Sequence, residues 1–197
     1  MKKIVLFLIF VAYALTAMAQ VSIGMRDTRY IFASYTMMDH YSATIEQSIY
    51  SEKPGFQYTR LYLSYRDDLP CHLHINVAPY YGMAWNNNYR NLGVLAGLRF
   101  KPCIAGVYAI VNPHYDSTYH YKTMFRAGAE INITKEIGIF SDYNTIPVYR
   151  EKEDRIRAGA SFKVRNLDVR PVISIPVSGN HKYNSVRVQM SFGYTFR

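Results

Sequence analysis

Apolar and polar residues alternate at every second position along most of this 197-residue chain. The clearest segments are 121–133 (YKTMFRAGAEINI), 154–165 (DRIRAGASFKVR) and 186–196 (VRVQMSFGYTF). Successive side chains of a β-strand point to opposite faces, so each segment has one apolar face and one polar face. No segment beyond residue 20 shows a helical period of apolar residues. The sequence therefore predicts an all-β protein.

The connections between these segments alternate between short and long, which is typical of an antiparallel up-and-down meander. Counted back from the C-terminus, the predicted strands are 184–196, 168–178, 154–165, 137–146, 121–133, 104–112, 90–100, 71–82, 56–66 and 40–50. These ten strands are the favoured count. Residues 28–37 are also strand-like, and pairing them with a short strand at 21–25 makes twelve.

The N-terminus has the pattern of a cleaved secretory signal. Met1–Lys3 is positively charged, Ile4–Leu15 is almost unbroken apolar sequence, and Ala17-Met18-Ala19 places small residues before a cut. We therefore expect a signal peptide over 1–19 and a single domain over 20–197.

The mature chain is expected to be a transmembrane β-barrel of the outer membrane. It has no run of 18 apolar residues, so a closed barrel is the form in which it can cross a bilayer. Strands of about nine to twelve residues have the length that a tilted strand needs. Many of the 19 tyrosines gather towards strand ends, where their rings suit the membrane interface. A soluble exported β-sandwich is the alternative.

The charge argues against binding of nucleic acid. The chain carries 23 Lys and Arg against 14 Asp and Glu, but no basic run is longer than a pair. In a membrane barrel the apolar face meets lipid and the polar face lines the lumen. The predicted lumen charge network consists of Glu46, Arg60, Arg99, Arg126, Glu130, Asp142, Arg155, Arg157 and Arg187. It is expected to interlock as ion pairs, and its cation excess also suits a narrow path that favours anions.

The C-terminal strand carries aromatic residues at alternate positions, Phe192, Tyr194 and Phe196. This resembles the C-terminal signature of Gram-negative outer-membrane barrels, and the resemblance implies recognition by the barrel-assembly machinery. In size and hairpin layout the chain is similar to small OmpA/OmpX-type barrels, particularly those of Bacteroidota. The resemblance implies contact with outer-membrane lipid and lipopolysaccharide.

The main functional prediction is a non-enzymatic barrel with an envelope-structural, surface-contact or limited-permeation role. Two alternatives remain open. One is an enzyme that acts on lipid A or peptides through an external loop at His114–His120, where His114, Asp116 and Ser117 have the residue types of a hydrolase. The other is a small anion-preferring channel. Motifs for phosphate, zinc or serine-hydrolase sites are missing, so no catalytic residue, cofactor or metal is predicted.

Cys71 and Cys103 both follow short turns. In the predicted order another strand separates theirs, which places the Cα atoms about 10 Å apart at normal strand spacing. A disulfide needs less than about 7 Å, so two free thiols are expected.

Overall fold

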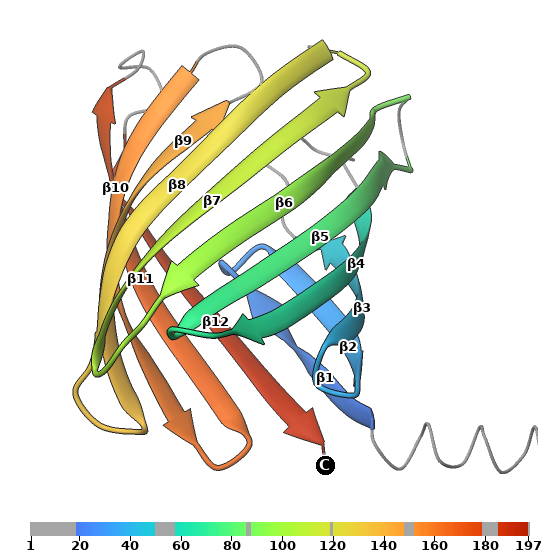
Figure 1. Cartoon of the computed structure of the whole chain (residues 1–197). Helices are drawn as coiled ribbons and strands as arrows, with labels where there is room; N and C mark the ends of the chain where they lie inside the picture. The colour runs from blue at the N-terminus through green and yellow to red at the C-terminus, as the bar shows by residue number, and fades with distance from the viewer. Residues whose placement is uncertain are drawn as a thin grey trace, which may run out of the picture.

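The computed structural model describes residues 19–49, 58–85, 88–118, 120–147, 152–178 and 185–196. They form twelve antiparallel strands that close into one barrel (Figure 1). The strands are β1 (Ala19–Arg26), β2 (Tyr30–Met37), β3 (Tyr41–Ser48), β4 (Tyr58–Leu69), β5 (Leu73–Ala84), β6 (Arg90–Phe100), β7 (Ala105–Asp116), β8 (His120–Asn132), β9 (Ile137–Pro147), β10 (Lys152–Val164), β11 (Leu167–Ser178) and β12 (Arg187–Phe196). The predicted all-β, up-and-down architecture is confirmed.

The described residues form twelve strands. This is the alternative that the sequence analysis names beside its favoured count of ten. The two extra strands are β1 and β2, which pair from Ala19↔Met37 to Arg26↔Tyr30. β1 also pairs with β12, from Val21↔Phe196 to Met25↔Phe192. A barrel leaves no strand edge unpaired, and β1 supplies the backbone partners that β12 and β2 would otherwise lack.

The two ends of the barrel differ. Phe196 and the short turns 38–40, 70–72, 101–104, 133–136 and 165–166 lie at one end, which we call the turn end; the opposite end is the loop end. At the loop end the connection between β7 and β8 is only 117–119, because strand pairing continues to Asp116↔His120. The predicted long loop at His114–His120 is therefore wrong: most of it is strand.

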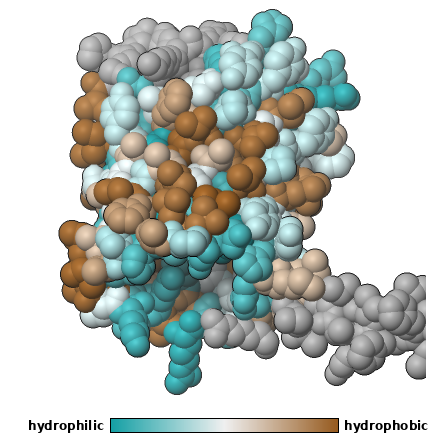
Figure 2. Space-filling view, viewed as in Figure 1, coloured by the Kyte–Doolittle hydropathy of each residue, from teal (hydrophilic) through white to brown (hydrophobic). Residues whose placement is uncertain are grey.

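The alternation of the sequence separates the two faces of the wall. Outward residues are large and apolar, as in Leu61, Leu63 and Val188, which are 47%, 56% and 77% exposed. Hydrophobic side chains cover the middle of the face seen in Figure 2, and hydrophilic ones lie below them and at the upper right. The most buried residues include many polar ones, among them Glu46, Asp142 and Arg155. This inside-out arrangement is typical of barrels that contact lipid.

No helix in the described part of the chain is long and apolar enough to cross a membrane.

Candidate functional site

Glu46 is the centre of a first charge cluster on the lumen wall. Its side chain is fully buried on β3. Arg60 of β4 donates to Glu46 Oε2 from Nη2 at 2.8 Å and from Nε at 3.3 Å. Arg26 of β1 forms an ion pair with the other carboxylate oxygen. We call these three residues the Glu46 cluster.

Asp142 is the centre of a second cluster. Arg157 of β10 holds it in a two-pronged contact, Nε to Oδ1 and Nη2 to Oδ2, both 2.8 Å. The Tyr108 hydroxyl donates to Oδ2 at 2.9 Å. Arg126 of β8 approaches Oδ1 more loosely, with Nε at 4.0 Å. We call Arg126, Asp142 and Arg157 the Asp142 cluster.

The two clusters lie on opposite sides of the barrel. In the closed order of twelve strands, β3 and β9 are six places apart, which is half of the circumference. Each cluster sets two guanidinium groups against one carboxylate. Arg126 Nε is buried and has no hydrogen-bond partner among the described residues. The charge of Asp27 also acts on Arg126 and Arg157, so the four arginines of the two clusters face three carboxylates, which leaves an excess of positive charge among these residues.

The remaining predicted network residues lie elsewhere in the lumen. Arg155 is fully buried and donates to Ser174 Oγ at 2.7 Å and to the carbonyls of Ser174 and Ser185 at 2.8 Å. Arg187 lies on the inward face of β12, on the same parity as Gln189 and Ser191. These two arginines lie near the loop end of their strands.

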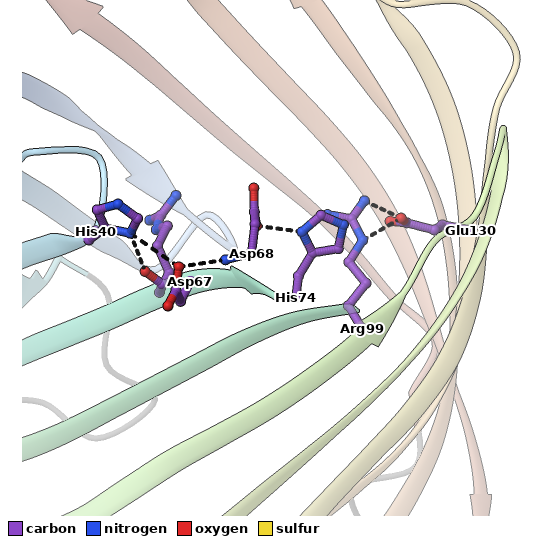
Figure 3. Close-up of polar contacts among 7 residues, drawn as sticks. His40, Asp67, Asp68, His74, Arg99 and Glu130 are labelled. Carbon is purple, nitrogen blue, oxygen red and sulfur yellow. Dashed lines mark hydrogen bonds and ion pairs between the residues drawn. The ribbon is translucent and has the colours of Figure 1, made fainter. Parts of the chain in front are cut away.

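The third group is at the turn end (Figure 3). Arg99 Nε donates to Glu130 Oε1 at 2.6 Å, and Lys101 Nζ lies 3.7 Å from the same oxygen. Next to it, His74 Nδ1 lies 2.5 Å from Asp68 Oδ1. Of the nine predicted residues, seven thus take part in ion pairs, in groups around Glu46, Asp142 and Glu130. Arg26 and Lys101 also belong to these groups, and the sequence prediction did not include them.

Arg60 also lies inside a cage of tyrosines. Its guanidinium carbon is 4.7 Å from the ring centre of Tyr62, 5.5 Å from that of Tyr80, and 5.7 Å from those of Tyr30 and Tyr58. A cation over aromatic faces is stabilised by the negative potential of the rings. The cage therefore keeps a charged arginine in the lumen although its salt bridge to Glu46 is shared with Arg26.

Three tyrosines reach along the wall over a glycine of the next strand to a polar residue on the strand beyond. Tyr58 passes over Gly82 to Asn91, Tyr80 over Gly93 to Asn112, and Tyr108 over Gly128 to Asp142; the hydroxyls donate at 2.6, 3.2 and 2.9 Å. An added Cβ on these glycines would lie 2.6, 2.7 and 2.9 Å from the respective ring Cζ atoms. We call each arrangement a tyrosine bridge. The sequence showed inward glycines, but their aromatic partners come from neighbouring strands.

The structure does not assemble the hydrolase-like group. His114 and Asp116 are buried on the inward face of β7. Ser117 Oγ accepts from the Arg90 N–H at 3.0 Å and donates to the Asn88 carbonyl at 3.3 Å, so it ties the β7–β8 turn to the start of β6. His120 lies beside Tyr115, with its Nδ1 3.4 Å from the phenol oxygen. Among the described residues, the contacts of Ser117 and His120 therefore do not join them to His114 and Asp116 in a hydrolase-like site.

The aromatic residues of the C-terminal signature all face outward. Phe192, Tyr194 and Phe196 are 41–49% exposed and stand beside Met25, Ile23 and Val21 of β1. Cys71 and Cys103 are exposed free thiols. Within the described ranges, no three residues of the types His, Cys, Asp and Glu group closely enough to hold a metal ion.

No protein-family model and no curated protein matches this chain. Among solved structures, it is similar to the KdgM porin in complex with disordered oligogalacturonate, at 10% identity and a TM-score of 0.64, over 91% of this chain and 99% of that porin. A BenF-like porin from Pseudomonas fluorescens Pf-5 has 11% identity and a TM-score of 0.48, over 90% of this chain and 58% of the porin. The likeness to the KdgM porin shows a shared barrel fold.

Proposed function

We propose that this protein is a non-enzymatic outer-membrane channel that conducts small anions in preference to cations. The observation that carries the proposal is the pair of facing clusters, each with two arginines per carboxylate. In a narrow lumen with a low-dielectric wall, such an excess of positive charge raises the local concentration of anions and repels cations. The porin-like fold also favours a channel over a purely structural or surface-contact role.

The proposed location in the outer membrane is also argued from the barrel itself. An outward apolar face and a closed barrel suit lipid contact, and they support a place in the outer membrane with lipid and lipopolysaccharide around the barrel. Phe192, Tyr194 and Phe196 are proposed as the signature that the barrel-assembly machinery reads. The resemblance to OmpA/OmpX-type barrels of Bacteroidota remains a prediction. So does the signal peptide over 1–19, of which residues 1–18 lie outside the described part of the chain.

The location is tested by expression of the full chain in a Gram-negative host. We expect the protein in the outer-membrane fraction, with Gln20 as its first residue and slower gel migration after boiling, because a closed barrel stays compact in detergent until it is heated. Recovery in the soluble periplasmic fraction would contradict the proposal and favour the exported sandwich.

Ion selectivity is tested in planar bilayers under a KCl gradient. We expect a reversal potential that lies closer to the equilibrium potential of chloride than to that of potassium. Replacing Arg126 with glutamine should reduce the preference for chloride several-fold, because this guanidinium has the loosest contact with its carboxylate. Lys163→Gln is the matched control, since it removes one inward cation near the turn end of β10. A closed lumen without conductance, or a preference for potassium, would contradict the channel.

A further inference from the structure

The turn between β1 and β2 lies within the height of the barrel and not at its rim. β1 and β2 have eight residues each, whereas β8 and β10 have thirteen. In Figure 1 these two strands, in blue, end well below the upper ends of β8 and β10. The register agrees, because Met25 pairs with Phe192 while β12 extends further towards the loop end, to Arg187. We call residues 27–29 the seam turn.

The seam turn is fixed to the lumen side of β12. The Asp27 N–H donates to Ser191 Oγ at 2.9 Å, and Ser191 lies on the inward face of β12. The Thr28 N–H donates to the Met190 carbonyl at 2.9 Å, and Thr28 Oγ1 accepts from the Met190 N–H at 3.1 Å. These bonds continue the contact with β12 beyond the end of β1, so the turn has a defined place in the lumen.

The carboxylate of Asp27 is directed across the lumen. Its Oδ1 accepts from the inward Ser191 Oγ at 3.4 Å. Its charge acts on Arg157 of β10 and Arg126 of β8, which are three and five strand places from β1 in the closed order. Five places correspond to about 24 Å along the wall at normal strand spacing, so Asp27 acts on Arg126 through the lumen and not along the wall. The turn therefore brings a carboxylate to the arginines of the Asp142 cluster.

The backbone of the seam turn suits aspartate. Asp27 and Thr28 have φ angles of 52° and 57°, and the Arg29 N–H donates to the Arg26 carbonyl at 3.0 Å, which closes a two-residue hairpin turn. Aspartate and asparagine are among the residues other than glycine that best tolerate this left-handed conformation. Asparagine can therefore replace Asp27 and remove its charge while the turn is kept.

We propose that Asp27 limits the anion preference of the channel, because the seam turn holds its carboxylate opposite Arg126 and Arg157 and permeating ions pass between these opposite charges. The carboxylate cancels part of the field of the two arginines, so chloride is favoured less than the arginines alone would cause. This inference rests on the proposed channel function. It adds a selectivity-determining residue that the sequence did not single out.

The test is the reversal potential of the full chain in planar bilayers under a KCl gradient. Asp27→Asn should raise the ratio of chloride to potassium permeability by about twofold or more, because it removes a negative charge from the path. Asp39→Asn is the matched control and should leave the ratio unchanged. Asp39 also has a positive φ, 57°, in the turn at the other end of β2, and its Oδ1 accepts from the exposed Gln20 amide at 3.4 Å.

A second variant tests the charge in channels that have already folded. Asp27→Cys is made in a chain whose two native cysteines, Cys71 and Cys103, are replaced by serine. A thiol reagent that carries a sulfonate should bring the permeability ratio back towards the wild-type value. A reagent that carries an ammonium group should raise the ratio above that of Asp27→Asn.

The outcomes separate this inference from the channel itself. If the wild type prefers chloride but Asp27→Asn leaves the ratio unchanged, or if Asp39→Asn raises it equally, the role of Asp27 is overturned and the channel is kept. Equal effects of the sulfonate and ammonium reagents would also overturn the role of Asp27. A wild-type protein that does not conduct, or that prefers potassium, would defeat the channel and this inference with it. Gel migration before and after boiling checks that each variant is folded.

Discussion

Replacing Glu46 with glutamine is expected to destabilise the barrel by about 3 kcal/mol, the lower end of the cost of breaking a buried ion pair. Glu46 is fully buried and binds Arg60 and Arg26 at once. Without the carboxylate, two guanidinium groups from β1 and β4 would face each other uncompensated. The side chain of Arg26 is 43% exposed and that of Arg60 is 21% exposed, so water offsets part of the cost.

The measurement is the free energy of unfolding in urea, with the protein refolded in lipid vesicles. Asp168→Asn is the matched control, because Asp168 also pairs with an arginine, Arg170, but at an exposed place. Exposed pairs contribute about 0–1 kcal/mol, so this variant should unfold near the wild-type urea concentration. Equal stability of the two variants would show that the Glu46 cluster does not hold β1, β3 and β4 together.

Adding a single methyl group at Gly24 is expected to open the seam where the barrel closes. Gly24 of β1 lies directly opposite Gly193 of β12. A Cβ at this position would overlap the carbonyl oxygen of Phe192 and lie 2.7 Å from the Gly193 Cα, and both are backbone atoms that cannot rotate away. Overpacking typically costs about 1–3 kcal/mol, and here the strain falls on the pairing of the first strand with the last.

Gly24→Ala should therefore lower the temperature at which the folded gel band disappears, and it should reduce the yield of folded barrel. Gly97→Ala is the control, since the same methyl group at Gly97 would meet its nearest atom, Ile110 Cγ1, at 3.5 Å, an ordinary contact. If both variants melt at the same temperature, the β1–β12 seam tolerates more space than the structure indicates.

The strand architecture and the orientation of side chains were readable from the sequence, because both depend on local alternation. The period of two over 121–133 and 154–165 places Arg126, Glu130, Arg155 and Arg157 on the polar face, and the structure has them on the inward side of β8 and β10. The short strand at 21–25 was visible too. Its pairing with both β2 and β12 depends on where the last strand ends, which is a long-range property.

The length of β7 shows why a local reading fails at the loop end. The polar, tyrosine-rich run at 113–120 has the composition of a loop, yet His114 and Asp116 are paired strand residues that line the lumen. Polar side chains are favourable on the inward face of this strand because the inside of the barrel is itself polar. Composition separates strand from loop only when the interior is apolar.

What the sequence by itself determined is the inside-out barrel: which segments are strands, which face is apolar, and that cations exceed carboxylates on the other face. Only the tertiary structure decided which charges meet, how many strands close the barrel, and that tyrosines of one strand lie over glycines of the next. The physical reason is that the face of a residue follows from its own strand. Its neighbours in the lumen instead follow from the register between strands and from closure, which the whole chain determines.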